Sequence, residues 1–157
     1  QDPGVLGLAG LLQRAGFDVT VSERIQRDIW FKLWGNMTMN PISALTGAPC
    51  DRILDDPLVR GFITAVMREA QQIGAAIGLP IAQTPEERHA VTRKLGSFRT
   101  SMLQDLQAGR PLEIDALVGA VHEIGQHLRL ATPHIDALLG LVRLMASERG
   151  LYAPTAA

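Results

Sequence analysis

Residues 32–47 read KLWGNMTMNPISALTG and form the most informative stretch of the chain. At about 100° per residue, Lys32, Asn36, Asn40 and Ser43 fall on one side of a helix. Tryptophan, leucine, methionine and isoleucine cover most of the remaining helix surface. A solvated face would more typically carry Glu, Lys, Arg or Gln, which favour helix formation and keep charge in water. One ammonium beside neutral hydrogen-bonding groups suits a small polar anion instead.

The same stretch contains Pro41 inside the expected helix. A proline at this position removes one amide donor and pushes away the carbonyl four residues earlier, that of Met37. Irregularities of this kind often accompany functional clefts. The alternative is a surface stripe whose asparagines cap a helix break at Asn40-Pro41, and periodicity alone does not decide between the two interpretations.

Downstream of residue 25 the apolar spacing is helical throughout. The predicted helices span about 25–46, 56–78, 85–98, 101–108, 113–129 and 133–149. Glycine and proline separate them, for example in Gly47-Ala48-Pro49 and Gly109-Arg110-Pro111. Thr84-Pro85-Glu86-Glu87 opens a helix with a capping threonine, a first-position proline and first-turn glutamates.

The first 22 residues differ from the rest. Apolar residues recur at helical spacing from Val5 to Leu12 and stop before Gly16, a natural helix end. Residues 17–21, FDVTV, then alternate as a short strand does. Because a strand needs a ladder partner and the chain has no second candidate, we expect its partners to be missing. The predicted fold class is all-α, a multi-helix bundle preceded by a short helix-strand remnant.

The 157-residue length suits one domain, and the composition, 46% hydrophobic and 20% charged, is that of an ordinary globular protein. A net charge of −1 with no basic run leaves little basis for binding nucleic acid. No apolar run approaches the roughly 18 residues of a membrane span, and no signal peptide is evident. The single Cys50 excludes an internal disulfide and suits a reducing compartment, so we expect a cytoplasmic protein.

Two motifs fall short of a recognised site. His122 and His127 are five residues apart, about 140° on a helix, so they cannot share a metal from one face, and we assign no metal. Gly4, Gly7 and Gly10 do not have the G-x-G-x-x-G spacing of a dinucleotide-binding turn, and no strand precedes them.

Two separated blocks resemble a known family. The first block comprises Trp30, Lys32-Leu33, Asn36, Asn40-Pro41 and Leu45-Thr46-Gly47. It resembles the signature that opens the C-terminal domain of the ketopantoate reductases. The second block comprises Thr100 to Leu106, Gly109-Arg110 and Glu113-Ile114-Asp115. It resembles the Ser-Met-Gln-Asp and Glu-Ile-Asp segment of that family, and the resemblance runs from about residue 22 to 148.

The resemblance implies roles for five residues. Lys32 resembles the catalytic lysine, here a general acid, and Glu113 the active-site glutamate, which would also bind the cofactor. Asn36, Asn40 and Ser101 resemble the substrate-binding residues. Taken alone, Glu113 would only stabilise the first turn of a helix and Ser101 would be a helix N-cap.

The resemblance also implies an activity, the NADPH-dependent reduction of a small 2-oxo acid such as 2-dehydropantoate to pantoate in pantothenate biosynthesis. The family usually has Asn-Gly shortly after Asp115, whereas this chain has Val118-Gly119, which leaves the exact substrate open. The bundle would be of the ketopantoate reductase and 6-phosphogluconate dehydrogenase C-terminal type.

This assignment divides the chain into three parts. Residues 1–22 would be the remnant of an absent N-terminal Rossmann domain that binds most of the NADPH, 23–153 the helical substrate-side domain, and 154–157 a flexible tail. The fragment alone is expected to be inactive, and a homodimer is possible. The alternative is a helical dimerisation or interaction module without catalysis, which could leave the five site residues scattered instead of gathered in one cleft.

Overall fold

The computed structural model describes residues 2–153, so the tail predicted at 154–157 lies outside the described residues. The helices are α1 (Pro3–Arg14), α2 (Ile25–Thr46), α3 (Cys50–Asp55), α4 (Pro57–Ala76), α5 (Pro85–Arg93), α6 (Ser101–Gln107), the π-helical turn η1 (Asp115–Gly119), α7 (Ala120–His127) and α8 (Pro133–Glu148). No strand occurs within residues 2–153. The all-α prediction is confirmed.

Three local predictions need correction. The strand expected at 17–21 is unpaired coil, because alternation cannot make a strand without a neighbour to complete its hydrogen bonds. The short helix α3 was not predicted. Helix α5 ends at Arg93 instead of continuing to 98, and Gly96 follows in the left-handed region, with φ of +62°.

Helix α2 is the central element of the bundle and packs against α3, α4, α6, η1 and α8. Its second half is buried on nearly all sides, and the indole Nε1 of Trp34 donates a 2.9 Å hydrogen bond to the carbonyl of Met67 on α4. Pro41 is buried within the helix, which continues to Thr46 and ends at Gly47 with φ of +69°. Packing on several sides fixes the backbone of α2 relative to its neighbours.

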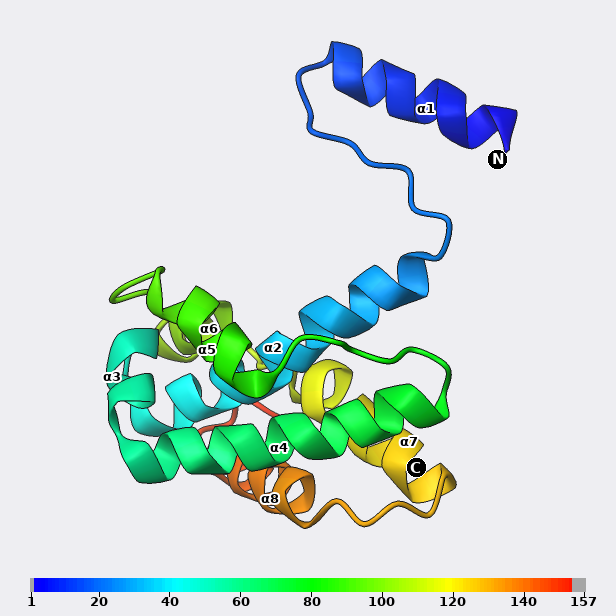
Figure 1. Ribbon diagram of the computed structural model, residues 1–157. Helices are drawn as coiled ribbons and strands as arrows, with labels where there is room; N and C mark the ends of the chain where they lie inside the picture. The colour runs from blue at the N-terminus through cyan, green and yellow to red at the C-terminus, as the bar shows by residue number, and fades with distance from the viewer. Residues whose placement is uncertain (1, 154–157) are drawn as a thin grey trace.

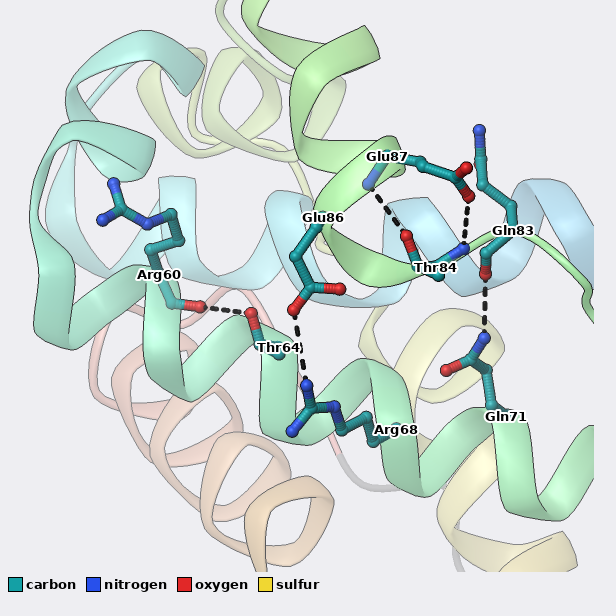
Figure 2. Close-up of polar contacts among 8 residues, drawn as sticks. All are labelled: Arg60, Thr64, Arg68, Gln71, Gln83, Thr84, Glu86 and Glu87. Carbon is teal, nitrogen blue, oxygen red and sulfur yellow. Dashed lines mark hydrogen bonds and ion pairs between the residues drawn. The ribbon is translucent and has the colours of Figure 1, made fainter.

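Polar contacts between α4 and the start of α5 hold the two helices together (Figure 2). The side chains of Thr84 and Glu87 form the predicted capping box at the start of α5. Arg68 of α4 pairs with Glu86 at 3.3 Å, and the amide of Gln71 donates to the carbonyl of Gln83 at 2.9 Å. These contacts set the position of the next residues along α5.

Helix α1 stands apart from the bundle at the end of an extended segment (Figure 1). Several of its apolar side chains are exposed, among them Val5, Leu8 and Leu11. Over residues 2–153, no helix combines the length and the apolar character needed to cross a bilayer.

Candidate active site

An open groove of about 470 Å³ lies between α2, the start of α6 and the segment that leads into and forms the start of η1. Its lining consists of Ile29, Lys32, Leu33, Asn36, Asn40, Ser101, Glu113, Ala116 and Leu117. All five of the predicted site residues are in this set. The structure therefore gathers side chains from three separate segments of the chain around one space.

The column on α2 supplies one side of the groove. Lys32 is exposed, Asn36 is half-buried, and Asn40 is only 7% exposed, so burial deepens along the helix. The alternative of a surface stripe at a helix break is wrong, because α2 runs unbroken through Pro41 and Asn40 is buried. Ser43 does not line this groove; its hydroxyl donates to the carbonyl of Ala48 at 2.8 Å and stabilises the end of α2.

Ser101 is the first residue of α6 and is exposed. The N-cap of this helix is Thr100, whose hydroxyl accepts a 3.2 Å hydrogen bond from the amide of Leu103. The alternative role of Ser101 as the N-cap is therefore wrong. Because its neighbour caps the helix, the Ser101 hydroxyl remains available to a molecule in the groove.

Glu113 lies just before η1 and not in the first turn of a helix starting at 113, as was predicted. On one side, the amide of Leu112 donates to the carbonyl of Leu151 at 3.0 Å. On the other, the carboxylate of Asp115 accepts hydrogen bonds from Arg143 at 2.6 Å and from Tyr152 at 3.0 Å. The residues on both sides of the exposed Glu113 are therefore held in place by hydrogen bonds to distant parts of the chain.

The charged groups of the groove have no partners of their own. Within residues 2–153, neither the ammonium of Lys32 nor the carboxylate of Glu113 makes a hydrogen bond or an ion pair. An ammonium, two amides, a hydroxyl and a carboxylate therefore face one space with their hydrogen-bonding capacity unused. Such a set can bind a small oxygen-rich molecule and supply a proton to it.

No group of three metal-binding side chains occurs in the part of the chain that the structure describes. His122 Nδ1 lies 2.9 Å from a carboxylate oxygen of Asp136, and His127 Nδ1 lies 2.9 Å from the carbonyl oxygen of Glu123. Each histidine thus has its own local contact.

Sequence reasoning missed the apolar walls of the groove and also Arg88 and His89, which line a smaller cavity beside it. The sequence does contain a signal that some group approaches α2 closely at this point, although it does not identify Arg88. Gly35 lies inside α2, where glycine is unfavourable, and a Cβ built there would be 2.6 Å from Nη2 of Arg88. A glycine inside a helix often marks such a close approach.

The chain is similar to proteins of known description. It matches the model "Ketopantoate reductase PanE/ApbA C terminal" over residues 24–146. The 2-dehydropantoate 2-reductase of Mesorhizobium japonicum is 46% identical to it, over 93% of this chain and 45% of that protein. The 2-dehydropantoate 2-reductase of Pyrobaculum aerophilum is 33% identical, over 89% of this chain and 50% of that protein.

Solved structures agree with these matches. A crystal structure from Ralstonia solanacearum MolK2, of a protein provisionally assigned as a ketopantoate reductase, has 64% identity and a TM-score of 0.92 over 97% of this chain and 46% of that one. The 2-dehydropantoate 2-reductase of Methylococcus capsulatus has 32% identity and a TM-score of 0.88 over 94% and 52%. The chain spans about half the length of the relatives that it matches. It belongs to the family of ketopantoate reductase C-terminal domains.

Proposed function

We propose that this chain is the substrate-side domain of an NADPH-dependent reductase that converts 2-dehydropantoate to pantoate, a step of pantothenate biosynthesis, in the cytoplasm. The observation that carries the proposal is the meeting of Lys32, Glu113 and the three substrate residues in one groove. The relatives named 2-dehydropantoate 2-reductase support the choice of reaction. Since the chain covers about half of those relatives, the other half is the natural partner domain.

The reaction places negative charge on the ketone oxygen as hydride reaches the adjacent carbon, so a proton donor at that oxygen lowers the barrier. Lys32 is suited to this task because its ammonium faces the groove and has no partner within residues 2–153. We assign it the role of general acid. Asn36, Asn40 and Ser101 would hold the other oxygen atoms of the 2-oxo acid.

Glu113 would orient the ammonium of Lys32 and accept a hydrogen bond from a ribose hydroxyl of the cofactor. It lies just before η1, on the groove side, and has no hydrogen bond or ion pair of its own within residues 2–153. This role explains why a glutamate is placed on so firmly anchored a segment.

NADPH would supply the hydride when bound. In this chain, Glu113 could contact a ribose hydroxyl of NADPH, whereas the residues present do not form a pyrophosphate-binding turn. Gly4, Gly7 and Gly10 lie inside or at the start of α1, so they do not form the turn that holds a pyrophosphate. We therefore assign the pyrophosphate to the partner domain, and to this chain the contact through Glu113.

The experiment joins this chain to the part of the Ralstonia solanacearum relative that precedes the matched region, and measures NADPH oxidation with a panel of 2-oxo acids. We expect turnover on 2-dehydropantoate by the joined protein and none by the 157-residue chain alone. A joined protein that folds, binds NADPH and reduces no 2-oxo acid would contradict the proposal. Turnover by the chain alone would contradict the need for a partner domain.

A second function, self-association, is favoured by an apolar hollow of about 420 Å³ that shares no lining residue with the groove. It is lined by side chains of α2, α4 and α8, namely Ile42, Leu45, Thr46, Leu58, Val59, Phe62, Leu138 and Leu141. Leu58 is 84% exposed, and contiguous apolar surface of this kind commonly marks an interface. We propose that the chain forms a homodimer through this face. Analytical ultracentrifugation should show a dimer for the unmodified chain and a monomer for Leu58→Glu. A Leu58→Glu variant with the same mass as the unmodified chain would contradict the proposal.

A further inference from the structure

The segment that contains η1 presents side chains to two different spaces. Glu113, Ala116 and Leu117 line the groove. Asp115 and Gly119 line a polar hollow of about 420 Å³ beside α8, which packs against η1. The groove and this hollow share no lining residue. Asp115 can therefore influence the groove only through the backbone that it shares with Glu113.

The carboxylate of Asp115 is the centre of a charged cluster in the hollow. Its Oδ1 atom accepts hydrogen bonds from Nη2 and Nε of Arg143 on α8, at 2.6 and 3.2 Å. The hydroxyl of Tyr152 lies 3.0 Å from both carboxylate oxygens, and the guanidinium of Arg143 lies 5.8 Å from the centre of the Tyr152 ring. Residues 28 and 37 positions further along the chain thus meet at one side chain of η1.

Both donors to Asp115 keep the protons that they donate. The hydrogen bond to Asp115 raises the pKa of Arg143, against the opposing effect of burial. Burial raises the pKa of Tyr152, and the hydrogen bond to Asp115 raises it further. At neutral pH the guanidinium is therefore charged and the phenol is protonated. Hydrogen bonds to an ionised group are stronger than those between neutral groups, so this cluster restrains η1 firmly.

Gly119 leaves room for the cluster. A Cβ at this residue would lie 3.0 Å from Oδ1 of Asp115 and 3.3 Å from Nη2 of Arg143, closer than a Cβ normally comes to such atoms. Glycine is unfavourable inside a helix, and the approach of these two charged groups accounts for it here. The amide of Ala120 donates to the carbonyl of Asp115, one residue further than in an α-helix. Turns of this π-helical kind are rare and frequently occur at functional sites.

The position of Glu113 is set by its backbone. Its side chain makes no hydrogen bond or ion pair of its own within residues 2–153. The backbone connection to Asp115 is short, since the two residues are separated only by Ile114, whose amide donates to the carbonyl of Leu112 at 2.9 Å. A displacement of Asp115 would therefore also displace Glu113.

We propose that Asp115, held by Arg143 and Tyr152, is a positioning residue that fixes Glu113 for its contact with a ribose hydroxyl of NADPH. The inference rests on the proposed function, in which Glu113 makes that contact. Asp115 itself would touch neither the substrate nor the cofactor. An acceptor that is already held in its bound position loses less conformational freedom when the ligand binds, so the ligand is bound more tightly.

The test is a double-mutant cycle in the joined protein, with the dissociation constant of NADPH measured by fluorescence titration. We expect Glu113→Gln to weaken NADPH binding about tenfold and Asp115→Asn about threefold. The variant with both substitutions should bind NADPH as Glu113→Gln does, because Asp115 acts through Glu113. If the cluster only stabilised the fold, Asp115→Asn would lower the unfolding free energy in urea and leave the NADPH affinity of the folded protein unchanged.

Two comparisons separate positioning from a general loosening of the bundle. Asp55→Asn removes the carboxylate partner of Arg93, at 2.8 Å, on an exposed residue that lines neither the groove nor the hollow, so it should leave NADPH binding unchanged. Asp115→Asn should leave KM for the 2-oxo acid unchanged, because the proposed substrate contacts are on α2 and α6. A rise in KM for both the cofactor and the acid would indicate loosening and overturn the positioning role.

NADPH affinity that Asp115→Asn does not change would also overturn it, as would a double variant whose loss equals the product of the two single losses. A joined protein that folds without binding NADPH would overturn it as well. If Asp115→Asn does not fold, Tyr152→Phe removes one hydroxyl and should weaken NADPH binding about twofold, but only while Glu113 is present. NADPH binding that depends on Asp115 through Glu113, together with no turnover of any 2-oxo acid, would retain the positioning role and refute the reductase function.

Discussion

The groove and the start of α8 differ in how their charged side chains are paired. At the start of α8, the buried carboxylate of Glu69 on α4 accepts hydrogen bonds from the amides of His134 and Ile135 at 3.1 and 2.9 Å, and lies 2.6 Å from Nδ1 of His134. In the groove, Lys32 and Glu113 have no such partners within residues 2–153. Polar groups that are satisfied internally stabilise the fold, whereas those left unsatisfied are available for a ligand. Substitutions in the two regions should therefore affect different measurements.

The largest expected effect is on turnover, from Lys32→Met in the joined protein. Removing a general acid should lower kcat by about 10²- to 10⁴-fold, with little effect on the unfolding free energy because Lys32 is exposed. The chain contains one other lysine, Lys94, which is exposed and lines neither the groove nor the smaller cavity beside it, so Lys94→Met is the matched control. Stopped-flow or steady-state NADPH oxidation gives the rates, and a kcat retained by Lys32→Met would exclude the lysine from proton transfer.

The next effect is on stability, from Glu69→Ala. The substitution leaves the first amides of α8 without their acceptor inside the protein, so the unfolding free energy should fall by about 2–3 kcal/mol. Urea denaturation measures the change. Glu148→Ala, at an exposed position on α8, should shift it by no more than about 0.5 kcal/mol. If both variants unfold alike, Glu69 does not stabilise the start of this helix.

A third, smaller effect separates two neighbouring polar residues of α2. Asn40→Ala should raise KM for the 2-oxo acid by about tenfold, because its amide faces the groove. Ser43→Ala lies one turn further on and removes the hydrogen bond to Ala48, so it should lower the unfolding free energy by about 1 kcal/mol without raising KM. An equal rise in KM for both variants would show that the effect arises from α2 as a whole.

The sequence predicted the elements whose signals are local. The bounds of α2, Ile25–Thr46, were predicted because its apolar spacing is regular and Gly47 ends it. The column of Lys32, Asn36 and Asn40 follows from helical geometry, so its common face was predictable too. The resemblance added Ser101 and Glu113, which no spacing rule could bring to that column.

Features that depend on distant contacts were not predictable. The π-helical turn at Asp115–Gly119 accompanies hydrogen bonds from Asp115 to Arg143 and Tyr152, 28 and 37 residues away in sequence. Nothing in the sequence indicates which arginine rests on Gly35, since Arg88 has no charged partner that would suggest its position. The prediction of a strand at 17–21 was wrong for the same reason. Alternation of apolar and polar residues indicates which side chains share a face, but it does not indicate a neighbouring strand to pair with.

The smallest expected effect concerns pH and the cavity beside the groove. Burial lowers the pKa of His89, and the positive charges of Arg60 and Arg93 lower it further against the opposing effect of Glu86. In the unfolded chain this histidine takes up a proton as the pH falls through about 6.5, while in the folded chain it stays neutral to lower pH. The unfolded state then binds more protons, so the unfolding free energy should decrease as the pH falls below about 6.5.

His89→Gln should make that decrease smaller, because glutamine cannot take up the proton. Urea denaturation at about pH 7.5 and at about pH 5 gives the decrease in unfolding free energy for the variant and for the unmodified chain. His127→Gln is the matched control, since His127 is exposed and makes one contact to a backbone carbonyl. If His89→Gln and the unmodified chain lose the same stability on acidification, the protonation of His89 does not differ between the folded and the unfolded chain.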